Sequence, residues 1–81
     1  MDLSGIFRGK VYDSDDPLRR GRIKALVPAI SDHELTWALP CFPFNGSSKP
    51  DQYAVPPAGT NVWIEFEQGD YDRPIWVGIF F

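Results

Sequence analysis

The chain has 81 residues and a formal net charge of −3, with 43% hydrophobic and 15% aromatic residues. This length fills one hydrophobic core, so we expect a single domain over residues 1–81, and the aromatic content excludes a disordered linker. The acidic balance disfavours a dedicated nucleic-acid binder, because the protein repels phosphate backbones. The single cysteine excludes an internal disulfide, and no apolar stretch is long enough for insertion in a membrane.

Charge is unevenly distributed along the chain. Residues 1–24 carry six basic and four acidic side chains, a net +2, whereas residues 25–81 carry two basic and seven acidic ones, a net −5. Two differently charged faces on one module favour head-to-tail contacts between the layers of an assembly.

Residues 5–12 and 22–27 predict the first two β-strands. Gly9 interrupts the first of them and marks a bulge or a tight barrel bend. The second alternates between apolar and basic positions, so we expect one of its faces to point into the core. The inward residues of this strand are Ile23, Ala25 and Val27.

The middle of the chain is rich in turn-forming residues. Residues 31–35 predict a brief helical turn, and residues 36–39 predict a third strand that ends at Pro40. Residues 40–57 contain five prolines, too many for a central strand. We therefore expect a long loop of functional importance there.

Two further strands are predicted near the C-terminal end of the sequence. Residues 61–67 alternate most regularly, and their inward face consists of Val62, Ile64 and Phe66. In residues 75–81 the same alternation assigns the core face to Ile75, Val77 and Ile79. The outer face of these two strands then carries the rings of Trp63, Trp76 and Phe80. Five short strands without a helix long enough for a parallel crossover predict a small, all-β antiparallel barrel.

Several landmarks occur together and in order over nearly the whole chain. They are residues 9–11 (GKV), 16–17 (DP), 21–28 (GRIKALVP), 37–38 (WA), 43–46 (PFNG), 53–70 (YAVPPAGTNVWIEFEQGD) and 73–74 (RP), followed by Gly78. This series resembles the oligonucleotide/oligosaccharide-binding (OB) domain of phage baseplate hub and spike proteins and of the spike-base proteins of type VI secretion.

The resemblance implies a five-stranded antiparallel Greek-key OB-fold barrel. It also implies a homotrimeric collar between a hub ring and a membrane-piercing spike, in the tail baseplate of a virion assembled in the host cytoplasm. The sequence stops at Phe81, where relatives usually continue into a triple-stranded β-helix or a cell-wall hydrolase. Piercing and hydrolysis are therefore not implied, and we expect either a separate spike protein or a longer parent chain.

Catalytic and metal-binding patterns are weak in this sequence. His33 and Cys41 form the one possible base and nucleophile pair, and no third group that would orient the base is evident. Structural zinc needs four Cys or His ligands, and these two are all the chain has. The acidic residues 13–16 lack the glycine and the closing glutamate of a calcium loop, so they predict a solvated turn. We expect no enzyme activity, no metal and no cofactor.

The large aromatic rings are the candidate interface residues, because exposed rings on neighbouring strands mark subunit or partner contacts. Trp76 and the terminal phenylalanines are the first candidates, and rings of the proline-rich loop form a second patch. The full set is Trp63, Trp76, Phe80, Phe81, Phe42 and Phe44. The alternative is that the proline-rich loop covers these rings within one subunit.

The sequence therefore predicts a structural adaptor that joins a hub ring to a central spike by packing. The alternative is a single-stranded nucleic-acid-binding module that uses Arg20, Arg22 and Lys24 beside exposed rings. The absence of basic residues around Trp63 and Trp76 disfavours it. A weaker third interpretation is a carbohydrate-binding barrel with Trp and Tyr as sugar platforms.

Overall fold

The computed structural model describes residues 3–42 and 55–81 and consists of five short strands with their connections. The elements are β1 (Phe7–Asp13), β2 (Lys24–Leu26), β3 (Leu39–Pro40), β4 (Asn61–Phe66), a single 3-10 turn η2 (Glu67–Gly69) and β5 (Pro74–Ile79). No α-helix occurs in these two ranges, in agreement with the predicted all-β class.

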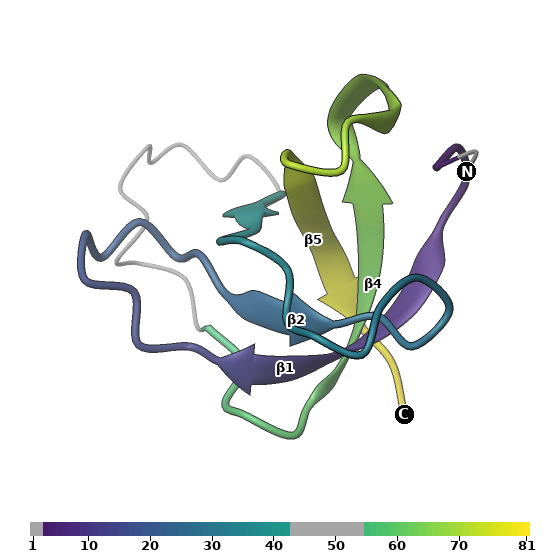
Figure 1. Ribbon diagram of the computed structural model, residues 1–81. Coiled ribbons are helices and arrows are strands. Elements are labelled where there is room, and N and C mark those ends of the chain that lie inside the picture. Colours follow the sequence, from purple (N-terminus) through teal and green to yellow (C-terminus); the bar gives the residue numbers. More distant parts are fainter. Residues whose placement is uncertain (1–2, 43–54) are drawn as a thin grey trace.

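The strands form one curled sheet in the order β2-β1-β4-β5-β3. β1 pairs antiparallel with β2 and with β4, and β4 pairs antiparallel with β5. An antiparallel bridge between Ile23 and Ala38 joins the two edges of the sheet through backbone hydrogen bonds of 2.6 and 3.2 Å. In Figure 1, β1 and β2 run across the direction of β4 and β5, which is the curl that brings these edges together.

β3 departs from the predicted antiparallel arrangement. It runs parallel to β5, with Leu39 opposite Ile75 and Pro40 opposite Trp76. Alternation of apolar residues indicates which face of a strand is buried, and it carries no information about the direction of the neighbouring strand. The five-stranded barrel prediction is confirmed, with this one pair parallel.

The core confirms the predicted inward faces of the second and fourth strands. Their buried apolar residues are Ile23, Ala25, Val27, Val62, Ile64 and Phe66. Gly9 of β1 is also buried, and a Cβ atom there would lie 3.1 Å from both Ile64 Cγ1 and Leu26 O. Gly9 therefore permits a close approach of strands, while the bulge of β1 lies between Val11 and Asp13.

The segment that follows β2 contains bends where the sequence predicts a helical turn at residues 31–35. The N–H of Leu35 donates a 2.9 Å hydrogen bond to Ala25 O of β2, and the Leu35 side chain is buried. Because the backbone of Leu35 is hydrogen-bonded to β2, it does not form the hydrogen bonds of a helical turn. This contact between distant segments outweighs the local sequence pattern that predicts such a turn.

The position of Trp76 corrects the sequence prediction. Alternation assigns its ring to the outer face, but the residue is 5% exposed and belongs to the core. Its indole Nε1 donates a 2.9 Å hydrogen bond to the carbonyl oxygen of Gly21, and Phe42 packs against it edge-on with ring centroids 5.5 Å apart. Trp76 is therefore not an exposed interface residue of this subunit.

A β-bulge causes this inversion of faces. β4 and β5 pair as Trp63 with Gly78 and then as Ile64 with Trp76, so Val77 is an extra residue without a partner in β4. One extra residue moves every preceding side chain of β5 to the opposite face. Trp76 thereby points into the barrel, and Ile75, which alternation places inside, lies on the outer face.

We expect Trp76→Phe to lower the free energy of unfolding by about 1–3 kcal/mol, because it removes the donor to a buried carbonyl oxygen. Trp63→Phe is the matched control, and we expect it to cost less than about 1 kcal/mol because this ring lies on the outer face. Urea unfolding monitored by circular dichroism measures both changes. Equal losses would contradict the core position of Trp76.

Candidate functional site

The loop between β1 and β2 is organised around the carboxylate of Asp16, which is 7% exposed. It accepts backbone hydrogen bonds from Leu18 (2.9 Å), Arg20 (2.9 Å) and Arg22 (3.2 Å). The guanidinium group of Arg22 adds two more, from Nε at 2.9 Å and from Nη2 at 2.8 Å. The Arg22 side chain, with help from the three backbone amides, holds the pKa of Asp16 far below its ordinary value against the effect of desolvation.

This ion pair is a feature that the sequence prediction missed. The acidic pattern predicts a solvated turn over residues 13–16, which is wrong for Asp16 at its end. The signal was present in Asp16-Pro17, because an aspartate before proline favours a turn closed by its own carboxylate. The same carboxylate raises the pKa of Arg22. Because the guanidinium donates two hydrogen bonds to Asp16, this cation is already paired within the protein.

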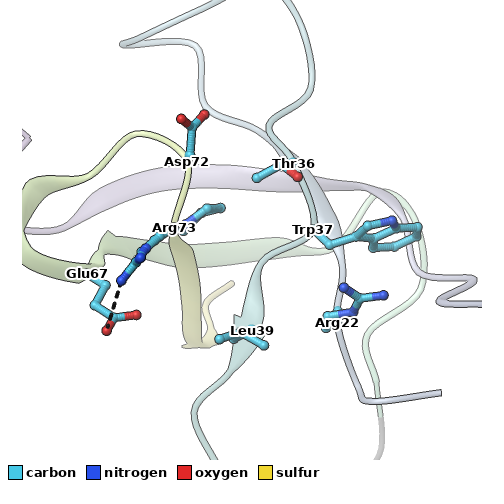
Figure 2. A pocket seen from close by; sticks show the side chains of 8 residues that line it. Arg22, Thr36, Trp37, Leu39, Glu67, Asp72 and Arg73 are labelled. Carbon is cyan, nitrogen blue, oxygen red and sulfur yellow. Dashed lines mark ion pairs between the residues drawn. The ribbon is translucent and has the colours of Figure 1, made fainter. Parts of the chain in front are cut away.

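An open groove of about 410 Å³ lies beside this loop, and Figure 2 shows the side chains that line it. Arg73 faces Glu67 at 4.0 Å and Asp70 at 3.5 Å. On the far side of the groove, Trp37 has Arg22 Cζ at 5.4 Å and Lys24 Nζ at 5.1 Å from its ring centroid. Both arginines of the groove thus have carboxylate partners already, and its tryptophan ring has two cations as neighbours.

The second surface lies on the outer side of β1, β4 and β5. The rings of Trp63 and Phe80 stack there with centroids 4.3 Å apart and planes inclined by 30°. Arg8 lies opposite Trp63 in the pairing of β1 with β4, and its Cζ is 5.5 Å from the Trp63 centroid and 5.3 Å from the Phe80 centroid. Phe81 is fully exposed beside them. We call Arg8, Lys10, Trp63, Phe80 and Phe81 the cationic aromatic patch.

An open depression of about 440 Å³ is part of this patch. Its lining consists of Arg8, Gly9, Lys10, Pro28, Asn61, Phe80 and Phe81. No carboxylate of residues 3–42 and 55–81 lies within ion-pair distance of Arg8 or Lys10. The prediction that Trp63 lacks basic neighbours is therefore wrong, because strand pairing brings Arg8 beside it from a distant part of the sequence.

The six predicted interface residues thus separate into three groups. Trp63, Phe80 and Phe81 come together in the cationic aromatic patch. Trp76 is in the core, with the half-buried Phe42 packed on it. Phe44 lies outside the described residues.

The described residues contain no group of three or more His, Cys, Asp or Glu side chains placed to hold a metal ion. Cys41 is an exposed free thiol, and His33 is exposed as well. In the same part of the chain, no helix has the length and apolarity needed to span a membrane.

The sequence was compared with protein families and with curated proteins. The model of the family described as the type VI secretion system/phage-baseplate injector OB domain matches residues 7–81. A search of curated proteins found no match.

We expect Asp16→Asn to lower the free energy of unfolding by about 2–4 kcal/mol at neutral pH, because it leaves Arg22 largely buried without a counter-charge. The folded pKa of Asp16 is depressed below its ordinary value of 3.8, so its contribution is present above that pH and is lost as the pH falls below it. The difference in stability between the wild type and Asp16→Asn should therefore shrink in acid.

Thermal unfolding of both proteins from neutral pH to below about pH 4 measures this dependence. Asp15→Asn is the matched control, because Asp15 is exposed and its side chain makes no ion pair within the described residues. A difference between the wild type and Asp16→Asn that stays constant through the acid range would contradict the assignment.

Proposed function

Because this chain belongs to the family of type VI secretion system and phage-baseplate injector OB domains, which gives it a structural role in a baseplate, we propose that it joins the hub ring to the central spike as a homotrimer. In this proposal the domain assembles in the host cytoplasm and works by packing against its neighbours. It catalyses no reaction and needs no cofactor.

The observation that carries the proposal is the cationic aromatic patch. Arginine and tryptophan are enriched among the residues that dominate protein interfaces, and here one of each lies on the outer face of the barrel with two phenylalanines. Arg8, Lys10 and Trp63 lie on the paired strands β1 and β4, so these side chains are presented by a rigid framework. Phe80 follows the end of β5, and its N–H donates a 3.1 Å hydrogen bond to Asn61 O of β4. A surface of this kind is suited to contact with a neighbouring protein.

Single-stranded nucleic-acid binding is less well supported by the same geometry. Such binding needs ring faces on which bases stack and cations that are free to neutralise phosphates. Trp37 has the cations of Arg22 and Lys24 near its ring, and Trp63 uses one of its two faces to stack on Phe80. Arg22, one of the three cations of that alternative, is held by Asp16.

Labelling of assembled particles tests the location that the proposal requires. We expect an epitope tag inserted after the exposed His33 to appear by electron microscopy at the junction of hub and spike. Particles that carry the untagged chain are the control. A label distributed along the tail tube, or absent from intact particles, would contradict the adaptor role.

Light scattering across a concentration series tests the oligomeric state. We expect the purified chain to approach the mass of a trimer as its concentration rises. A chain that remains monomeric at every concentration would contradict trimerisation by this domain alone and would leave the location test unaffected.

A further inference from the structure

We propose that the cationic aromatic patch binds a carboxylate-bearing segment of another baseplate protein, and that Arg8 is the residue that takes the carboxylate. The inference rests on the proposed function, since it assigns the chemistry of a partner that the adaptor contacts. It specifies one occupant, an acidic protein segment that also carries apolar side chains.

The position of Arg8 prepares it for this contact. Its guanidinium lies against the side of the Trp63–Phe80 stack, with Cζ at 5.5 and 5.3 Å from the two ring centroids. A guanidinium held over aromatic rings keeps N–H groups at its edge that match a carboxylate in two parallel hydrogen bonds. The rings restrict a long side chain before the partner arrives, so less conformational entropy is lost on binding.

Arg8 differs from Arg22 and Arg73 because no described carboxylate lies within ion-pair distance of it. Arg22 is paired with Asp16, and Arg73 faces two carboxylates. Arg8 and Lys10 are exposed on the same side of β1 and have no such partner among the described residues. The patch is thus locally cationic on a protein whose formal net charge is −3, and its complement is an anion.

The surroundings of the two cations favour a protein over a nucleic acid. Trp63 and Phe80 each use one ring face for their own stack, and Arg8 lies beside that stack, so neither ring offers both faces to a base. The depression is lined on its other sides by Pro28 and Phe81, which suit an apolar side chain next to the carboxylate.

A second copy of this chain is the rival occupant, because a contact between two different surfaces of identical molecules can close into a ring. The acidic turn of the chain, which includes η2, connects Phe66 to Pro74 at one end of the β4–β5 hairpin, and the patch is near the other end, where Val62 pairs with Ile79 (Figure 1). Two carboxylates of that turn already face Arg73, so they are less available to the patch of a neighbouring copy. We therefore assign the patch to a different protein, and the self-association of the chain tests the rival.

A peptide titration of the isotopically labelled full chain tests the assignment. The probe is a short synthetic peptide of glutamate and leucine residues, and its counterpart has glutamine in place of every glutamate. We expect shifts of the backbone amides of Arg8 and Lys10 and of the Trp63 indole, with the acidic peptide bound at least about tenfold more tightly than its counterpart. Arg8→Gln should lower the affinity about ten- to a hundredfold.

Arg20→Gln is the matched control, because it removes one exposed positive charge outside the patch and should leave the affinity nearly unchanged. Lys10→Gln is a second variant that keeps the ring stack intact, and the spectrum of each variant shows whether it remains folded. Equal affinity for the two peptides, or equal losses in Arg8→Gln and Arg20→Gln, would overturn the proposal.

Two further outcomes would identify a different binding partner for the patch. Tighter binding of an oligothymidylate of matched length at the same residues would identify a nucleic-acid site. Self-association of the wild type that Arg8→Gln abolishes, without any peptide bound, would identify a second copy as the partner. Failure of the peptide experiment leaves the labelling of particles unaffected, so the two proposals fail separately.

Discussion

The carboxylate of Asp16 holds the segment through which the barrel closes. Five hydrogen bonds converge on it, and they fix the loop that leads into β2. This loop places the carbonyl oxygen of Gly21 against the Trp76 indole and brings Ile23 to its bridge with Ala38. β3 has only two residues, so few ladder hydrogen bonds are available at the closure. An ion pair and an indole hydrogen bond supply the connection that a longer strand would otherwise make.

Three arginines illustrate how the same side chain serves different purposes on this small surface. Arg22 forms an ion pair with Asp16 in the loop that closes the barrel. Arg73 faces Glu67 and Asp70, which belong to the same acidic turn as Arg73. Arg8 rests on two rings and keeps its hydrogen-bonding edge free of the described carboxylates. The charge of a residue therefore does not show whether it is paired within the protein or free to bind a partner. That depends on the loops and strands around it, which the fold brings together.

The sequence was sufficient for properties that depend on local pattern. Alternation identified the inward faces of β2 and β4, and the ordered landmarks identified the family. It was insufficient where a feature depends on two distant segments. The bulge that turns Trp76 inward is defined by the register of β5 against β4, and Arg8 meets Trp63 only because β1 pairs with β4. The direction of β3 is likewise a property of the assembled sheet.

The bulge at Val77 connects the core to the cationic aromatic patch. With strict alternation along β5 and the residue that follows it, Trp76 and Phe80 would share one face, and both rings would be either buried or exposed. One extra residue between them separates their roles: Trp76 points inward to the Gly21 carbonyl, while Phe80 remains outside and stacks on Trp63. Arg8 lies against that stack. The bulge that turns Trp76 into the core therefore also positions the Phe80 ring that contacts this exposed cation. A strand whose one ring completes the core can in this way position the residue that follows it for an exposed interface.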